Sequence, residues 1–323
     1  MEQLYRKDER GMVKRFFQVK ESGILLALIC LCLGLSLTTT TFLSQYNIGI
    51  VIRQVSFVAI VALGETLVLL LGGIDLSVGA TAGLSSILGA LLMTAVKLDP
   101  YLCLALAMVI GALFGALNGV LIALVKLNPF IVTLAMGEIY AGAILVITKG
   151  YPVLGIPPKF TFLGQGMLGP VPVPVIIMLV ITVILAHILH NTPYGRRIYA
   201  IGGNPFASRL VGIPVEQIKI SVYAISGMLS ALAGILFVSR MNAGQPSIGQ
   251  GWLMPAITAA IIGGTSLSGG EGTILGTILG AVFMGILANG IVLLGISAYW
   301  ERVIIGAVVL VAVVIDILRS RKK

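Results

Sequence analysis

The sequence predicts an all-α, polytopic integral membrane protein with about ten transmembrane helices. Hydrophobic residues make up 58% of its 323 positions and charged residues only 10%, a balance that excludes an ordinary soluble domain. Apolar stretches of the length that a bilayer core requires, roughly 20 residues, recur along the chain. The formal charge of +9 gathers in short segments beside these stretches, which is how membrane helices are oriented and is not a nucleic-acid surface.

Ten apolar stretches are the expected spans, and they make residues 23–318 one transmembrane domain. The first stretch is too long for a signal peptide and no small-x-small site follows it, so we expect an uncleaved first span. Residues 1–22 are expected to be a charged cytoplasmic segment and residues 319–323 a basic cytoplasmic tail. The expected spans are 23–43, 48–71, 78–96, 101–125, 129–148, 171–190, 218–238, 252–267, 273–294 and 302–318.

The distribution of positive charge predicts the orientation. With the N-terminus in the cytoplasm, fifteen Lys and Arg residues fall inside, and the segment 191–217 also lies on the cytoplasmic face. Arg53 lies within a span, and the residues left outside are Lys97, Lys149, Lys159, Arg240 and Arg302. The excess of inside charge predicts that both termini are cytoplasmic.

The longest polar interruption that carries several positive charges begins at Asn191. Asn191 or Thr192 is placed to cap a helix that begins with Pro193 and ends at the pair Gly202 and Gly203. A glycine pair of this kind ends a helix and allows a sharp change of direction. The pattern therefore predicts a first short helix on the cytoplasmic side.

A second short helix follows at once. Asn204 caps it and Gly212 lies just past its end, while Phe206 and Leu210 are four residues apart and share one face. An apolar ridge flanked by Arg196, Arg197 and Arg209 is typical of a helix that sits in a groove on a partner. The alternative is a well-capped surface loop whose arginines only set orientation, and the loop by itself does not separate the two interpretations.

Two glycine-rich stretches repeat one pattern. Residues 72–90 read GGIDLSVGATAGLSSILGA and residues 263–281 read GGTSLSGGEGTILGTILGA, which agree in the opening Gly-Gly, in Leu-Ser and in the closing Ile-Leu-Gly-Ala. Small-residue helix packing explains part of this agreement. We favour a duplicated half with a broken element in each copy, lying near the cytoplasmic face or re-entering the membrane.

Six polar residues within or beside the spans are candidates for a translocation path. Asp75 is expected to cap the third span rather than to bind a ligand, and Glu65 and Glu138 are either path residues or structural contacts. The two asparagines each precede a glycine inside a span and are expected to bond between helices. The six candidates are Arg53, Glu65, Asp75, Asn118, Glu138 and Asn289.

No catalytic constellation is apparent, so we expect a protein that is not an enzyme. The sequence has no GxxxxGK[ST] motif for ATP and no HExxH motif, and its only histidines are His187 and His190. The three cysteines lie within apolar runs and form no disulfide or zinc pattern. We therefore expect no metal and no cofactor in this chain. The outside loop 149–170 is rich in Pro and Gly and is expected to be irregular or to hold one short helix, as a docking surface.

Three motifs together resemble the permease subunit of a bacterial ABC importer of the ribose-type sugar branch. They are GGIDLSVG (72–79), YGRRIYAIGGNPFASRLVGI (194–213) and AIIGGTSLSGGEGTILGTILGA (260–281). The resemblance implies a bacterial inner-membrane protein that pairs with a second permease, either another copy or a homologous chain. It also implies cytoplasmic ATPase subunits that hold ATP and Mg and grip the 194–213 region, and an extracytoplasmic binding protein that delivers the solute.

Some residues depart from that family pattern. The segment before GGTSL has no acidic residue where relatives often have one, Pro205 and Phe206 follow Asn204, and Glu65 stands where an uncharged residue is usual. The main alternative is an ion-coupled secondary transporter of a small polar solute, which also uses broken helices and repeats. An intramembrane enzyme is a third class, for which the sequence offers neither a nucleophile with its base nor a metal set.

Overall fold

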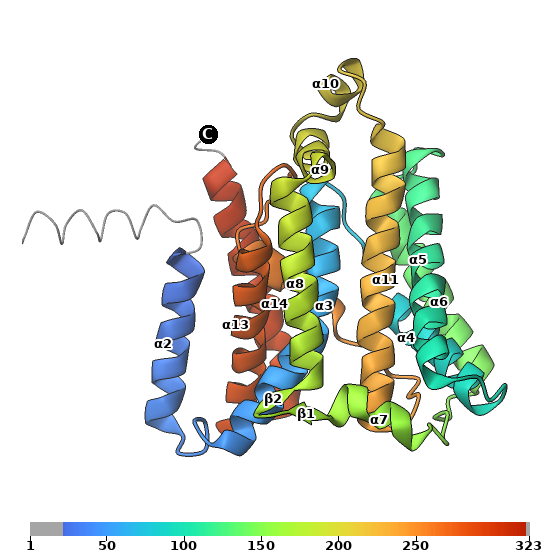
Figure 1. Ribbon diagram of the computed structural model, residues 1–323. Coiled ribbons are helices and arrows are strands. Elements are labelled where there is room, and N and C mark those ends of the chain that lie inside the picture. Colours follow the sequence, from blue (N-terminus) through green and yellow to red (C-terminus); the bar gives the residue numbers. More distant parts are fainter. Residues whose placement is uncertain (1–21, 321–323) are drawn as a thin grey trace, which may run out of the picture.

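The computed structural model describes residues 22–320, which form a bundle of helices that run roughly side by side (Figure 1). The expected N-terminal segment, apart from Ser22, and residues 321–323 of the expected tail lie outside the described residues. The first half of the chain gives α2 (Ser22–Thr38), α3 (Gln45–Leu70), α4 (Val78–Thr94), α5 (Pro100–Ala123) and α6 (Pro129–Thr148).

The second half begins with the short helix α7 (Pro158–Gln165) and a hairpin whose two strands have two residues each. The hairpin pairs β1 (Met167–Leu168) with β2 (Val171–Pro172) in antiparallel fashion. The remaining helices are α8 (Val173–Asn191), α9 (Pro193–Gly203), α10 (Pro205–Leu210), α11 (Val215–Met241), α12 (Leu253–Ile262), α13 (Ile274–Leu293) and α14 (Ala298–Ser320). The all-α prediction is therefore confirmed, and α7 is the short helix expected in the outside loop.

Six helices within residues 22–320 are long and apolar enough to cross a membrane: α3, α5, α6, α8, α11 and α13. Three further apolar helices are shorter, namely α2 from Gly23, α4 and α12. The predicted span 252–267 differs most from the structure, because α12 has only ten residues and ends at Ile262. Ten residues rise about 15 Å, half the thickness of a bilayer core, so the prediction of a continuous helix there is wrong.

Helices α5 and α11 pack closely against each other. Gly111, Gly115 and Gly119 follow one another at intervals of four on α5 and face α11. A Cβ on Gly115 would lie 2.0 Å from the carbonyl oxygen of Tyr223, and one on Gly227 would lie 2.1 Å from that of Gly111. Small residues at this spacing let two membrane helices approach backbone to backbone, and α3 and α4 pack on α11 as well.

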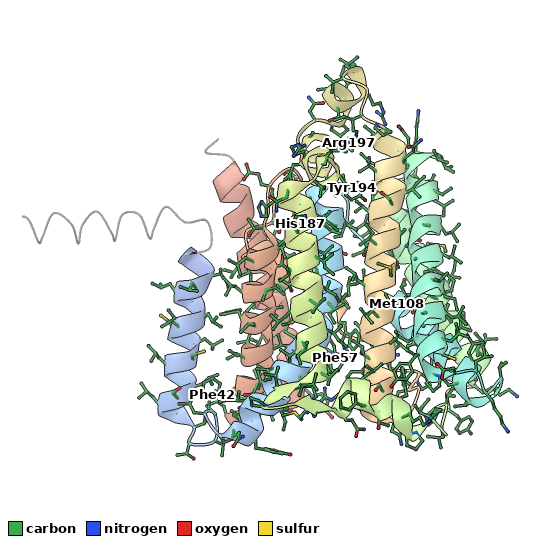
Figure 2. All side chains as sticks on the ribbon, in the orientation of Figure 1. Phe42, Phe57, Met108, His187, Tyr194 and Arg197 are labelled. Carbon is green, nitrogen blue, oxygen red and sulfur yellow. The ribbon has the colours of Figure 1, made fainter. Side chains whose placement is uncertain are left out.

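The two ends of the bundle differ. α9 and α10 project at one end, where α2 begins and α14 finishes, and α7 with the hairpin lies at the opposite end (Figure 1). Arg197 and Tyr194 mark the first end, and Phe42 lies toward the second (Figure 2). The prediction that both termini share a side with the segment 191–217 stays a prediction, since residues 1–21 and 321–323 lie outside the described residues.

The repeated motif forms a similar turn in both copies. The N–H of Ser77 donates to Oδ1 of Asp75 at 3.0 Å, and the N–H of Ser268 donates to Oγ of Ser266 at 3.2 Å. These are matching positions of the two motifs. The copies differ afterwards, since α4 starts at Val78 while Gly269, Gly270 and Gly272 all have positive φ and delay α13 until Ile274. A helix follows the break in both copies and contains the matching Ile-Leu-Gly-Ala, but α13 begins later in the motif than α4 does.

Candidate functional site

Helix α9 is anchored to the bundle by its apolar face and two tyrosines. Ile198 and Ile201 are fully buried. The hydroxyl of Tyr199 donates to the carbonyl oxygen of Gly272 at 2.9 Å, and the hydroxyls of Tyr194 and Ser221 are 2.7 Å apart. Thr192 is the N-cap and accepts from the N–H of Gly195, so it takes the capping role that the sequence left open between it and Asn191. Helix α9 is therefore fixed to α11 and to the second break.

Helix α10 has the boundaries that the sequence predicts, and it presents its apolar side chains outward. The side chain of Asn204 accepts from the N–H of Ala207 and caps the helix, and Gly212 follows it with φ of 80°. Phe206 is 68% exposed and Leu210 74% exposed. Large apolar side chains with this exposure on a capped, anchored element are typical of a surface that a partner covers.

The arginines of this segment have different surroundings. Arg196 and Arg197 on α9 are exposed. Arg209 forms a salt bridge with Glu216 of α11, with Nη2 2.6 Å and Nε 3.0 Å from the same carboxylate oxygen. This pairing was not predicted, because its only signal in the sequence is a spacing of seven residues across a glycine turn. The pair links α10 to α11. Because it is partly exposed, it contributes little to stability.

Glycines join α9 to both broken elements. The N–H of Gly270 donates to the carbonyl oxygen of Leu70 at 2.9 Å, and a Cβ on Gly202 would lie 1.8 Å from that oxygen. A Cβ on Gly269 would lie 2.7 Å from the nitrogen of Gly72. We call this contact of Leu70, Gly72, Gly202, Gly269 and Gly270 the glycine junction. It brings together the three motifs that carry the family resemblance.

Gly203 differs from its neighbour. Both glycines lie in the 194–213 region where the family resemblance places the ATPase contact, and Gly203 would require a special backbone only if its φ were positive. Its φ is not in that region, and a Cβ there would meet no atom within 4 Å. Gly202 is therefore the glycine that the packing demands, because backbone atoms of two other segments lie against it.

Glu65 and Asp75 face each other across the first break and are both buried. Glu65 is 0% exposed and Asp75 1% exposed. The N–H of Asp75 donates to Oε1 of Glu65 at 3.1 Å, while Oε2 of Glu65 has no hydrogen-bond partner among the described residues. Of the two roles that the sequence left open for Glu65, this geometry favours a structural contact.

Asp75 does not cap α4 in the expected way. The N-cap residue is Ser77, and Asp75 stands two residues earlier, where Oδ1 accepts from both the N–H and the Oγ of Ser77. The side-chain amide of Asn118 on α5 donates to the same Oγ at 2.9 Å. The break is thus held by side chains of α3 and α5 as well as by its own, and Asn118 bonds to a neighbouring element, as expected.

The first break lies inside the membrane-spanning bundle. A Cβ on Gly137, the ninth residue of α6, would lie 3.5 Å from the carbonyl oxygen of Leu76 and from Cα of Ser77. The hydroxyl of Tyr223 on α11 donates to the carbonyl oxygen of Ile74 at 3.2 Å. After α3 ends at Leu70, the chain therefore returns beside these helices before α4 begins, so the first break re-enters the bundle.

The other three path candidates are scattered. Asn289 exchanges two amide hydrogen bonds with Asn47, at 2.9 and 3.0 Å, and so links α13 to α3. Nη2 of Arg53 lies 3.4 Å from the carbonyl oxygen of Gln165, beside α7 at the opposite end from α9. Glu138 is exposed on α6. These residues do not form one site with Glu65 and Asp75, and the assignment of all six to one path stays a prediction.

Comparisons with known proteins agree with one another. Residues 47–313 match the family described as branched-chain amino acid transport system, permease component. The chain is 43% identical over 300 residues to the ribose import permease protein RbsC of Bacillus subtilis (strain 168), covering 92% of this chain and 93% of that protein. It is 37% identical over 299 residues to the D-allose transport system permease protein AlsC of Escherichia coli (strain K12), covering 92% and 91%.

A further relative is the fructose import permease protein FrcC of Rhizobium meliloti, 35% identical over 283 residues, with 85% of this chain and 79% of that protein covered. No solved structure matches the chain. The similarity to ribose import permeases confirms the resemblance that the three motifs carry.

Proposed function

The chain belongs to the family of permease components of the branched-chain amino acid transport type, and from this premise we propose that it is the membrane subunit of a sugar importer driven by ATP. Its relatives are named as ribose, allose and fructose permeases and align over most of their length. Ribose is the first solute to test, because the ribose permeases are the most similar of these relatives. The family assignment favours this function over an ion-coupled carrier.

ATP and Mg belong, in this proposal, to a separate cytoplasmic ATPase that engages α9 and α10. The observation that carries the proposal is the pair of exposed apolar side chains on α10, Phe206 and Leu210. The neighbouring helix α9 packs tightly on the bundle through the glycine junction. A partner that moves α10 would thereby pull on Leu70 and Gly270, which lie where the two broken elements meet. Arg196 and Arg197 supply positive charge around this surface.

The opposite end suits an extracytoplasmic binding protein. Helix α7 and the hairpin form an ordered surface there, and Phe160 and Gly164 of α7 are buried against the bundle. Arg53 lies beside this surface. We place α9 and α10 on the cytoplasmic side of a bacterial inner membrane, which puts both termini in the cytoplasm, and we propose a second permease subunit as the other wall of the path.

The test is reconstitution of the whole importer. The permease is co-expressed with the ATPase and binding protein encoded beside it and placed in proteoliposomes, and uptake of radiolabelled D-ribose is followed with ATP on the cytoplasmic side. We expect uptake that requires ATP and binding protein and survives a protonophore. Uptake that persists without ATP and stops when the proton gradient collapses would overturn the proposal in favour of ion coupling.

A further inference from the structure

The chain between α11 and α12, residues 243–252, contains no helix and turns back into the bundle along α4. We call it the re-entrant segment. Near its start Gly244 exchanges two backbone hydrogen bonds with Val153, each 2.9 Å, and a Cβ on Gly244 would lie 3.0 Å from Cβ of Ala90. Farther along, a Cβ on Gly79 would lie 2.5 Å from the carbonyl oxygen of Gly249. The segment therefore follows α4 from near its end to its first turn.

This course takes irregular backbone into the membrane. From Ala90 back to Gly79 the helix α4 rises about 16 Å, and α12 then adds about 15 Å from its ten residues. The two pieces together span the roughly 30 Å of a bilayer core. The predicted eighth span is thus replaced by an irregular, turn-rich piece followed by a short helix.

The two sides of the re-entrant segment differ in exposure. Ala243, Gly244, Ile248, Gly249 and Trp252 are buried, and Gly83 of α4 makes room for the segment, because a Cβ there would lie 2.7 Å from the carbonyl oxygen of Ile248. On the other side Ser247, Gln250 and Gly251 are exposed. Non-helical backbone at membrane depth is tolerated only where it is buried in protein or lines a water-filled path. Exposed polar groups on such backbone therefore do not face lipid.

Glu138 does not share this surface. Its neighbour Gly137 packs against Ser77, and Tyr140 and Ile144 are buried on the same face of α6. Glu138 is exposed on the opposite face of that helix, with Leu134. The exposed hydroxyl, amide and backbone groups of the re-entrant segment are therefore the polar surface beside the first turn of α4.

We propose that Ser247, Gln250 and Gly251 contact the solute as it passes through the membrane, and that they suit a polyhydroxylated molecule. Hydroxyl and amide groups both donate and accept, so together they match a sugar's alternating donors and acceptors. The inference rests on the proposed function, which supplies the solute class. A small number of direct contacts suits transport, because a tightly bound solute would not be released on the far side.

The first experiment separates solute contact from assembly. Gln250→Ala and Ser247→Ala permeases are reconstituted with ATPase and binding protein, with Thr182→Ala as control, because the Thr182 hydroxyl is already satisfied by the carbonyl oxygen of Met178 in its own helix. We expect the D-ribose concentration for half-maximal uptake to rise ~3- to 10-fold, as for loss of one hydrogen bond, and the order of competing sugars to change. ATP hydrolysis stimulated by loaded binding protein should stay near wild type.

Unchanged uptake and sugar order in both variants would overturn the inference while leaving the proposed function intact. If the wild-type importer takes up no sugar, the proposed function fails instead. A second measurement does not depend on transport. Ser247→Cys and Gln250→Cys are made after Cys30, Cys32 and Cys103 are replaced by Ser, with Val183→Cys, 68% exposed on apolar α8, as the control.

A small, charged, membrane-impermeant thiol reagent should modify Cys at positions 247 and 250 and leave position 183 unmodified, since the first two face water and the last faces lipid. D-ribose delivered by the binding protein should slow the modification. Absence of modification at 247 and 250 in the assembled importer would mean that protein or lipid covers this side of the segment, and the inference would be wrong.

Discussion

The N–H of Asp75 donates a hydrogen bond to Oε1 of Glu65, so the chain that re-enters the bundle is tied to the helix it has just left. Both side chains are buried. A buried N–H that loses its acceptor pays the full cost of its desolvation, typically about 1–3 kcal/mol. The acceptor, rather than the charge, is what this contact requires of Glu65.

Glu65→Gln should therefore keep the fold and near-normal D-ribose uptake, because the amide oxygen can still accept from Asp75. Glu65→Leu, of similar size, should lower the unfolding free energy by about 1–3 kcal/mol, because it leaves the N–H of Asp75 unsatisfied. Thermal unfolding of the purified permease and uptake in proteoliposomes measure the two effects. Loss of uptake in a well-expressed Glu65→Gln permease would show that the carboxylate charge itself is needed.

The two copies of the repeated turn offer a comparison. Asp75 accepts two bonds from Ser77 and a longer one, 3.5 Å, from Ser226, whereas Oγ of Ser266 accepts one bond from Ser268, near the surface. Asp75→Ala should lower the thermal unfolding midpoint clearly and Ser266→Ala only slightly, because buried acceptors cost more to remove than exposed ones. The thermal unfolding midpoint of Asp75→Asn should lie between those of the other two variants. Equal shifts for Asp75→Ala and Ser266→Ala would contradict the role of burial here.

The glycine pair at the end of α9 provides a matched test of the glycine junction. A methyl group on Gly202 would lie 1.8 Å from the carbonyl oxygen of Leu70, and one on Gly203 would meet nothing within 4 Å. Gly202→Ala should push α9 off the bundle, reducing the yield of folded permease or uncoupling ATP hydrolysis from uptake. Gly203→Ala should behave like wild type in both respects. Wild-type coupling in Gly202→Ala would mean that α9 and the broken elements move independently.

The sequence predicted helix positions well because long apolar runs and strong caps leave few alternatives. Thr192, Asn204 and Gly212 mark helix ends where they were expected. It failed at residues 252–267 because Trp252 to Ile262 is as apolar as a true span, and hydropathy does not reveal that the preceding residues lie in the membrane as irregular chain with turns. The packing of this segment on α4, as at Gly249 and Gly79, does so.

The candidate site was predicted only in part, because its local patterns are visible in the sequence and its long-range contacts are not. Local patterns located both breaks and the segment with Phe206 and Leu210, but contacts between distant segments leave little trace in one sequence. The bond from Tyr199 to Gly272 and the approach of Gly202 to Leu70 join residues far apart in the chain. The pairing of Arg209 with Glu216 depends on a turn whose direction the residues between them do not specify.

Helix α10 is the proposed contact with the ATPase. If Phe206 and Leu210 insert into an apolar groove of the ATPase, truncating both should weaken binding strongly, since buried anchors at an interface each cost about 2 kcal/mol or more. The Phe206→Ala, Leu210→Ala permease should fold normally, because both side chains are mostly exposed in the chain by itself. It should retain little ATPase on a tagged column and show no solute-stimulated hydrolysis.

Two variants define the specificity of that result. Leu127→Ala removes another exposed apolar side chain, 46% accessible in the connection between α5 and α6, and should leave ATPase retention unchanged. Arg209→Ala removes a partly exposed salt bridge, worth at most about 1 kcal/mol, and should be milder than Phe206→Ala. Full retention and stimulation in the double variant would mean that α10 is a well-capped surface helix and that coupling to the ATPase takes place elsewhere, with Arg196 and Arg197 of α9 the next residues to replace.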